Sequence, residues 1–368
     1  MAVDRRRFLG AVGVGAGLLM TEGVAEARGE VRVYLGTYTT WTGGGAGLGI
    51  AAYDPRTGRL RSVGVVEGVP NPSFAITAGR RVYAVNEQSA GAVTALEVRD
   101  GVPRVLNTQS TGGADPCHLV LHRGHVLSAN YSSGSVSVHP VRRDGGLGAR
   151  TDLVRHEGSG PDPDRQEGPH AHQVLPDPTG EFVFAVDLGA DAVFGYRLSP
   201  EGRLTRVSTA RLHPGAGPRH LAFHPNGRFA YVANELDSTI VVASYARGEL
   251  TPGQQLSTLP AGAPTTPRNY PAEVLVSADG RFVYLSNRGH DSVAVFAVGR
   301  DGAELRLVEA VPVGGAFPRH LALDPAGRFL LAANQNSGSV TTFAVDRQSG
   351  RLRQTSTFEA PVPVCVAF

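Results

Sequence analysis

The chain has 368 residues, 41% of them hydrophobic, so it is long enough and apolar enough to form a large folded domain. Its formal net charge of +2 excludes the strongly basic surface typical of nucleic-acid-binding proteins. All 35 basic residues are arginine, which excludes lysine nucleophiles and Schiff bases and leaves guanidinium groups to hold any bound anion.

The first 27 residues predict a twin-arginine signal peptide. Three arginines at positions 5–7 precede an apolar stretch at 9–20, and small residues at 25 and 27 flank a cleavage site. We therefore expect export by the twin-arginine pathway to the periplasm, the cell surface or the medium. No later apolar run is long enough to cross a bilayer, so no stable membrane insertion is expected after cleavage.

The first three predicted strands comprise residues 31–37, 48–53 and 60–66. After them, a sequence unit of about 44 to 53 residues occurs six times. Each unit opens on a proline followed by an apolar strand; these prolines are Pro72, Pro116, Pro169, Pro218, Pro271 and Pro318. A second strand ends in Asn or Asp, a third alternates polar and apolar residues, and a fourth follows a glycine turn. Four short strands per unit predict a β-propeller blade.

The two ends of the chain complete the count of blades. The first unit has a second, a third and a fourth strand but lacks the first strand that begins at a proline. The last residues, Pro363–Phe368, have the pattern of such a first strand, but no further strands follow them in the sequence given. We predict that this C-terminal strand completes the first blade, which closes the ring and hides an open sheet edge. The predicted fold class is all-β, a seven-bladed β-propeller formed as one domain by residues 28–368.

Residues 215–245 read GAGPRHLAFHPNGRFAYVANELDSTIVVASY, and the ordered motifs GPRH, HPNG and NEL in this stretch resemble the lactonase family of propellers. Segments beginning at Gly168, Ala272 and Pro318 resemble the same family in the same order, so the likeness covers essentially the whole mature chain. The resemblance implies an enzyme of the 6-phosphogluconolactonase type that hydrolyses a sugar lactone. The family also contains carboxy-muconate cyclases, so a cycloisomerase remains an alternative, and so does a non-catalytic exported binding propeller.

Comparing equivalent positions between units distinguishes structural from functional residues, because a residue type that recurs in many units is expected to be structural. The Asn or Asp that ends each second strand recurs, as does a histidine two places after the proline (His118, His220 and His320), so both are expected to be structural. The positions directly after the proline and directly after the Asn or Asp vary freely. Because the first and second strands are antiparallel, both variable sets are expected at one mouth of the channel.

These variable positions supply the candidate site. The residues predicted to be catalytic, to which the resemblance also assigns catalytic or substrate-binding roles, are His170, Glu235, Arg219 and Arg288. The residues predicted to bind the substrate are Arg319, Glu273 and His172. Within its unit, His172 falls where other units carry leucine. Because the basic groups exceed the nearby acids, the expected substrate is a small anionic molecule or a sugar lactone.

Opening a lactone requires an activated water and a group that stabilises the oxyanion. His170 is expected to act as the base near neutral pH, with Glu235 orienting it or serving as the base itself, while the arginines stabilise negative charge. The Gly-Ser pairs lie in turns without the strand-to-helix setting of a nucleophilic serine, so direct attack by water is expected. His170 and His172 share a strand face, but no acid or cysteine cluster completes a metal site, so neither metal nor cofactor is expected.

The remaining expectations concern the two cysteines and the partners. Cys117 and Cys365 fall in different units and are expected to be buried free thiols rather than a disulfide. No nucleic-acid partner is expected, and the protein is expected to be a monomer.

Overall fold

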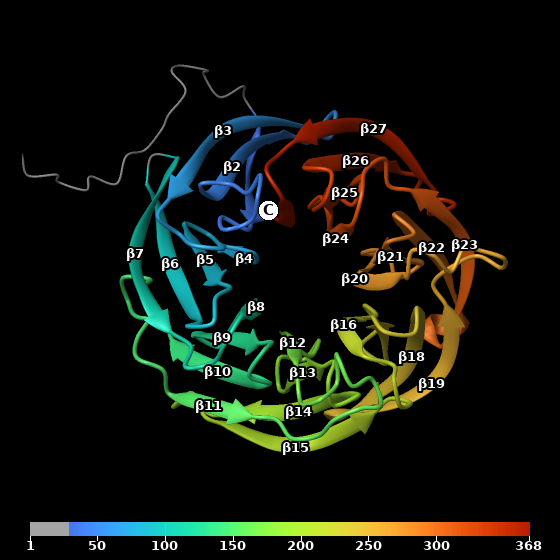
Figure 1. The fold of residues 1–368 in the computed structure, drawn as a ribbon, viewed down its shortest axis with the longest axis horizontal. Helices are drawn as coiled ribbons and strands as arrows, with labels where there is room; N and C mark the ends of the chain where they lie inside the picture. The colour runs from blue at the N-terminus through green and yellow to red at the C-terminus, as the bar shows by residue number, and fades with distance from the viewer. Residues whose placement is uncertain (1–28, 100) are drawn as a thin grey trace, which may run out of the picture.

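The computed structural model describes residues 29–99 and 101–368, which form a ring of seven four-stranded antiparallel sheets (Figure 1). The all-β, seven-bladed propeller is therefore confirmed. The predicted signal peptide of residues 1–27 lies outside the described residues. Within the described part of the chain, no helix is long and apolar enough to cross a membrane.

The four strands of each blade follow one another from the channel outward. Blade one contains β28 (Pro363–Ala367), β1 (Val31–Thr37), β2 (Gly47–Asp54) and β3 (Arg59–Glu67). Blade two contains β4 (Ala75–Ala78), β5 (Arg81–Asn86), β6 (Ala92–Arg99) and β7 (Val102–Ser110). Blade three contains β8 (Pro116–His122), β9 (His125–Asn130), β10 (Ser135–Pro140) and β11 (Asp152–Arg155). Blade four contains β12 (Ala171–Pro176), β13 (Val183–Asp187), β14 (Ala192–Leu198) and β15 (Leu204–Arg211).

The last three blades repeat the same order. Blade five contains β16 (Pro218–Phe223), β17 (Phe229–Asn234), β18 (Thr239–Ala246) and β19 (Glu249–Ser257). Blade six contains β20 (Tyr270–Val276), β21 (Phe282–Arg288), β22 (Ser292–Gly299) and β23 (Glu304–Pro312), with the 3-10 turn η1 (Arg300–Gly302) before its last strand. Blade seven contains β24 (Pro318–Leu323), β25 (Phe329–Asn334), β26 (Ser339–Val345) and β27 (Leu352–Glu359).

The last strand of the chain, β28, closes the ring as predicted. It pairs antiparallel with β1, so that Tyr34 lies opposite Ala367. At the other end of this pair, Thr37 Oγ1 donates a hydrogen bond to the carbonyl oxygen of Pro361 over 2.6 Å. The first and last described strands therefore belong to one sheet, and β28 is its innermost strand.

The hydrophobic core is divided among the contacts between neighbouring blades. Between blades four and five, one buried cluster includes Phe184 of β13, Leu221 of β16 and Val241 of β18. Seven buried clusters of this kind fill the seven contacts around the ring. Because the blades hold one another by burial, the loops at the two ends of the channel are free to carry functional side chains.

The recurring asparagines brace the turn that follows the second strand of a blade. Asn130 Nδ2 donates a hydrogen bond to Ser135 Oγ over 3.1 Å, and Asn234 Nδ2 donates one to Thr239 Oγ1 over 2.9 Å. Both asparagines are fully buried, so these bonds satisfy amide nitrogens that water does not reach. The predicted structural role of this position is confirmed.

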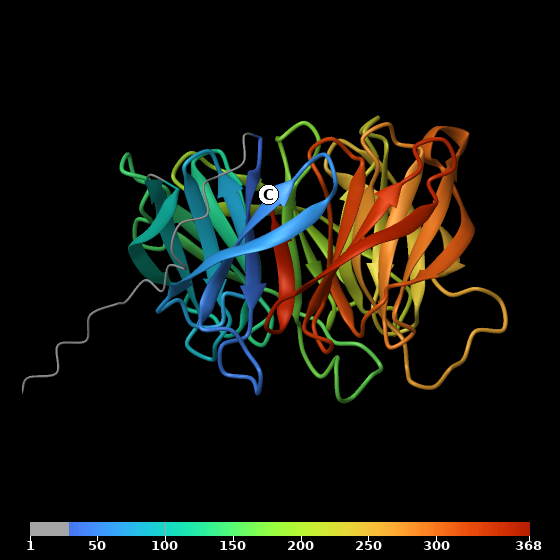
Figure 2. The ribbon, with the colours of Figure 1, turned by 90° about the horizontal axis from the view of Figure 1, so that it is seen from above.

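Three long connections extend from the same face of the ring. They follow β1 (residues 38–46), β11 (residues 156–170) and β19 (residues 258–269), and Figure 2 shows them below the ring as blue, green and orange loops. The inner strands begin at this face and the second strands end there. Loop residues can therefore reach the same mouth of the channel as the two variable positions of each blade.

Candidate active site

A β-bulge opens most of the inner strands at this mouth. In blade five, the register pairs Pro218 with Asn234 and leaves Arg219 as the extra residue. The same register makes Cys117 and Arg319 the extra residues of blades three and seven. A bulged residue is released from the regular strand ladder, which re-aims its side chain. The positions after the proline and after the Asn thus lie at one mouth, as predicted.

The mouth opens into a cavity of about 580 Å³. Its described lining residues are Tyr38, Trp41, Glu87, Cys117, Tyr131, Arg165, His172, Glu235, Tyr270, Arg288, Phe317, Arg319, Gln335 and Asn336. Four predicted site residues belong to this wall, namely Glu235, Arg288, Arg319 and His172. The other three, His170, Arg219 and Glu273, lie outside it. No serine, threonine or lysine is among the described residues of the wall.

Glu235 is buried and holds together the arginines on one side of the cavity. Its Oε1 accepts a hydrogen bond from Arg165 Nη2 over 2.7 Å, and its Oε2 accepts one from Arg288 Nη2 over 2.6 Å. Arg219 Nε lies 3.3 Å from Oε2. Although burial opposes its ionisation, Arg288, Arg165 and Arg219 outweigh burial and hold the pKa of Glu235 well below its ordinary value. This carboxylate therefore orients guanidinium groups and is a weak proton acceptor.

Arg319 and Glu87 bring a second pair of charges into the wall, from blades seven and two. Glu87 Oε1 accepts a hydrogen bond from Tyr38 OH over 2.9 Å, and the Arg319 guanidinium lies 5.8 Å from the centre of the Tyr38 ring. Burial disfavours the charge of Arg319, but Tyr38 and Glu87 outweigh it and raise its pKa. Within the described residues the Arg319 guanidinium donates no hydrogen bond, so it is free to contact an anionic group in the cavity.

Blade four departs by two residues from the register that the sequence predicts. Its first strand pair places Ala171, rather than Pro169, opposite Asp187. The extra residue of its bulge is therefore His172, the structural equivalent of Arg219 in blade five. The expectation that His172 stands where other units carry leucine is wrong, because Pro169 lies in the loop before β12 and not in the strand.

His170 lies beside the cavity instead of in its wall. Its ring stacks on Tyr131, with the ring centres 4.6 Å apart, and its Nδ1 lies 3.1 Å from the Tyr131 carbonyl oxygen. Its Nε2 lies 3.1 Å from Glu167 Oε1. Tyr131 lines the cavity and its hydroxyl accepts a hydrogen bond from Arg165 Nη2 over 3.0 Å. His170 is thus placed to act on the cavity through Tyr131.

Arg219 and Glu273 lie deeper, around a chamber of about 10 Å³ that has room for one water molecule. Glu273 Oε1 lies 3.0 Å from His220 Nδ1, and its Oε2 lies 3.6 Å from His320 Nε2. The recurring histidines therefore brace a buried carboxylate, which agrees with a structural role. Burial and the neighbouring arginines lower the pKa of Arg219 to about 9, and its buried Nη1 has no hydrogen-bond partner.

Among the wall residues that were not predicted from the repeats, three come from long loops. Arg165 comes from the loop between β11 and β12, while Tyr38 and Trp41 come from the loop after β1 and stack with ring centres 4.5 Å apart. These loops are longer than the corresponding connections in most other units, so many of their residues have no equivalent position with which to compare them. The only indication of Arg165 in the sequence was its position shortly before Pro169, one of the recurring prolines.

The wall offers neither a nucleophilic thiolate nor a metal site. Cys117 and Cys365 are buried free thiols, as predicted. Burial raises the pKa of the Cys117 thiol above its ordinary value, so this thiol stays protonated at neutral pH. Across residues 29–99 and 101–368, no group of three or more His, Cys, Asp or Glu side chains is placed to hold a metal ion.

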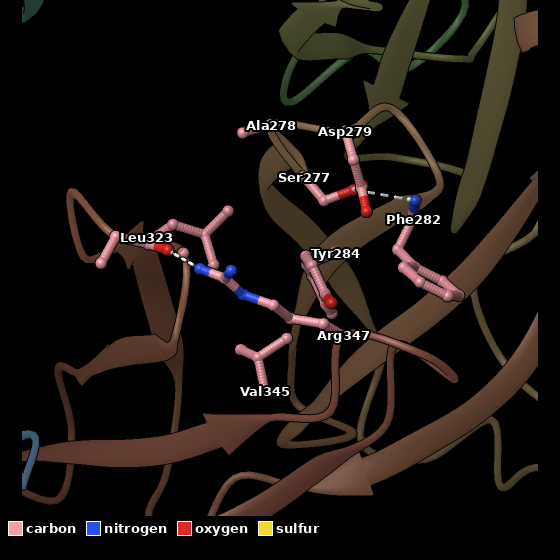
Figure 3. A pocket seen from close by; sticks show the side chains of 10 residues that line it. Ser277, Ala278, Asp279, Phe282, Tyr284, Leu323, Val345 and Arg347 are labelled. Carbon is pink, nitrogen blue, oxygen red and sulfur yellow. Dashed lines mark hydrogen bonds between the residues drawn. The ribbon is translucent and has the colours of Figure 1, made fainter.

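A second pocket, of about 160 Å³, lies between blades six and seven at the opposite ends of their strands (Figure 3). Its polar groups are bound by their own turns: Ser277 Oγ donates to Asp279 Oδ1 over 2.6 Å and accepts from the Phe282 amide over 3.0 Å. The Arg347 side chain donates to the Ala326 carbonyl oxygen. Because these groups do not converge on a common point, the cavity at the channel mouth is the candidate active site.

Comparisons with known proteins show the family to which the chain is related. The family model described as lactonase, seven-bladed β-propeller, matches residues 32–368. A 6-phosphogluconolactonase of Bacillus subtilis is 38% identical over 295 residues, which cover 78% of this chain and 83% of the relative. The solved periplasmic gluconolactonase of Pseudomonas aeruginosa superposes with a TM-score of 0.84 at 34% identity, covering 91% of this chain and 98% of that one. A candidate 6-phosphogluconolactonase of Bacteroides fragilis gives a TM-score of 0.85 at 32% identity, covering 94% and 99%.

Proposed function

Because the chain belongs to the lactonase family of seven-bladed β-propellers, we propose that it hydrolyses a sugar lactone by direct attack of water in the cavity at the channel mouth. The observation that carries this proposal is the set of guanidinium groups arranged around Glu235 in a wall whose described residues include no serine, threonine or lysine. Such a wall can stabilise an oxyanion and bind an anion, but its described residues supply no serine or threonine hydroxyl for an acyl-enzyme.

The proposed reaction balances with water as the only co-reactant. Water attacks the lactone carbonyl carbon and gives a proton to a base as the new C–O bond forms. The carbonyl oxygen becomes an oxyanion, which the guanidinium groups of Arg288 and Arg319 stabilise. The ring C–O bond then breaks, and the ring oxygen takes up the proton to become a hydroxyl of the product acid. Glu235 is a positioning residue that fixes Arg165 and Arg288.

The charge of the wall favours an anionic sugar lactone. Three arginines line it against two glutamates, and one of those arginines, Arg319, makes no hydrogen bond to the described residues. One relative is named a 6-phosphogluconolactonase and another a gluconolactonase, so the phosphate is the feature to test. We propose that both the glucono-δ-lactone ring and its 6-phosphate fit the cavity, with the phosphate bound more tightly.

The experiment is an assay of the purified protein on glucono-δ-lactone and on its 6-phosphate, following the acid released. Hydrolysis of either lactone, with a lower KM for the phosphate ester, is the expected result. Failure to hydrolyse either one, together with cyclisation of a carboxy-muconate, would instead favour the cycloisomerase. Failure of every substrate would favour the non-catalytic binding propeller.

The register of blade four leads to a prediction about its two histidines. His172→Ala should lower kcat/KM about 10- to 100-fold, the scale of one lost hydrogen bond to a charged group, because His172 lines the cavity. His170→Ala should lower it less, because His170 reaches the cavity only through Tyr131. The measurement is steady-state kinetics of both variants. A larger loss in His170→Ala would restore His170 as the principal histidine.

We also propose that the protein acts outside the cytoplasm, after export by the twin-arginine signal of residues 1–27. The relative from Pseudomonas aeruginosa is named periplasmic, which supports this location. Changing Arg5 and Arg6 together to lysine should retain the protein in the cytoplasm, because the transport machinery recognises this arginine pair. Cell fractionation measures the outcome, with Arg7→Lys as the matched control that keeps the pair. Unchanged export of the double variant would contradict the signal assignment.

A further inference from the structure

Glu87 stands at the position in blade two that Glu235 occupies in blade five. Each glutamate directly follows the asparagine that ends the second strand of its blade, Asn86 or Asn234. Both line the cavity, and Figure 1 shows their blades on opposite sides of the channel. The active-site cavity therefore has two carboxylates that enter it from equivalent places in different blades.

The two carboxylates differ in the groups that bind them. Glu235 accepts its hydrogen bonds from guanidinium groups, whereas Glu87 accepts from neutral hydroxyls. Tyr38 OH donates to Glu87 Oε1 over 2.9 Å, and Ser73 Oγ donates to Glu87 Oε2. The backbone amide of Glu87 donates a hydrogen bond to the Asn71 carbonyl oxygen over 3.0 Å, which fixes the backbone directly after β5. Glu87 is thus held in place without a strong ion pair at its oxygens.

Several charged and titratable groups face Glu87 from neighbouring elements. These are Arg319 on β24, Tyr38 after β1, Asp115 before β8, and Cys117 on β8. Glu87 also borders the deeper chamber that Arg219, Glu273 and His320 line. Burial raises the pKa of Glu87 above its ordinary value, and Arg319 only partly offsets this. A carboxylate with a raised pKa has more affinity for a proton near neutral pH.

The other titratable groups of the wall are less suited to take a proton. Glu235 is stabilised as an anion by three arginines. Burial, and then Arg219, lower the pKa of His172 well below that of a free histidine. The hydroxyl of Tyr131 is bound by Arg165, and burial raises its pKa. When the environments of two carboxylates in one site drive their proton affinities apart, one acts in proton transfer and the other stays charged.

We propose that Glu87 is the general base that takes the proton from the attacking water. This inference rests on the proposed lactone hydrolysis and adds a residue to it. The Glu87 carboxylate accepts one proton from water as the oxygen bonds to the carbonyl carbon. The resulting carboxylic acid returns that proton to the ring oxygen when the ring C–O bond breaks. Glu87 therefore ends the cycle ionised, and no further reactant is needed.

The test is a comparison of pH–rate profiles of the wild type, Glu87→Gln and Tyr38→Phe. Wild-type kcat should fall on the acidic side as Glu87 becomes protonated. Glu87→Gln should lower kcat by about 10²-fold or more and lose that acidic limb. Tyr38→Phe removes a hydrogen bond that favours the ionised form, so it should retain the limb and shift it to higher pH. A residue with a purely structural role would not move the limb.

The outcomes separate this inference from the proposed function. If the wild type hydrolyses lactones and Glu87→Gln keeps both its rate and its acidic limb, Glu87 is not the base. If Glu87→Gln does not fold, Tyr38→Phe decides: an unmoved acidic limb overturns the proposal, and a limb shifted to higher pH supports it. If the wild type opens no lactone, the proposed function itself fails. Binding of D-gluconate to Glu87→Gln shows whether that variant keeps an intact cavity.

Discussion

Replacing Glu235 by glutamine should lower lactone hydrolysis by about 10²-fold or more, the scale of losing preorganised electrostatic stabilisation. The Glu235 carboxylate receives Arg165 on one oxygen and Arg288 on the other. A glutamine offers an NH₂ group in place of one acceptor, which places a donor against a guanidinium donor. The arginines then lose their fixed geometry, so both kcat and KM should worsen in steady-state assays.

The same substitution should destabilise the fold in a pH-dependent way. Removing one partner of a buried ion pair costs about 3–5 kcal/mol, because the remaining charges stay buried. Since the folded-state pKa of Glu235 is depressed, its ionised carboxylate stabilises the fold fully above its ordinary pKa of 4.5. That contribution is lost as the pH falls toward the lowered value. The difference in Tm between wild type and variant should therefore be largest at neutral pH and shrink below about pH 4.5.

A matched control is available on the third strand of blade two, away from the channel. Glu97 also lies between two arginines, Arg81 and Arg99, but it belongs to β6 and does not line the cavity. Glu97→Gln should leave lactone hydrolysis near the wild-type rate. If Glu235→Gln and Glu97→Gln are equally active, the arginine cluster around Glu235 has no part in the reaction.

The sequence predicts the fold well because the fold is a repeat. Each blade carries the same proline, and blades two to seven also carry an Asn or Asp at the end of the second strand. The pairing of Pro218 with Asn234 shows that these two residues are partners in one sheet. The variable positions beside these recurring residues include Glu235, Arg288 and Arg319, and all three line the cavity. Comparing units therefore locates residues that the ring geometry brings together.

Comparing units fails where a residue is placed by something other than the repeat. In blade four the strand starts at Ala171 rather than at Pro169, so the motif alone gives the wrong register for His170 and His172. Arg165 and Trp41 reach the wall from loops whose course depends on packing against other blades. The sequence shows such loops only as irregular segments, and their positions follow from the assembled ring.

Deleting residues 361–368 should abolish soluble, folded protein, because it removes the innermost strand of blade one. Without β28, the inner edge of β1 loses its hydrogen-bonded partner and Tyr53 loses its edge contact with Phe368, whose ring centre lies 5.0 Å away. An unpaired strand edge and an open blade contact expose apolar surface to aggregation. Yield of soluble protein and the cooperativity of thermal unfolding measure the effect. Cooperative melting near the full-length Tm would contradict closure by β28.

A pair of point variants tests closure more gently. Val366 on β28 is 3% exposed and belongs to the cluster between blades seven and one, whereas Val207 on the outer strand β15 is 43% exposed. Val366→Asp places a charge in this apolar cluster, so it should lower the free energy of unfolding by several kcal/mol. Val207→Asp should change the free energy of unfolding by about 0.5 kcal/mol or less. The substitution is the same and only its place in the ring differs. Denaturant unfolding of both variants therefore measures whether the C-terminal strand is part of the core. Equal free energies of unfolding for the two variants would mean that the packing of β28 contributes little to stability.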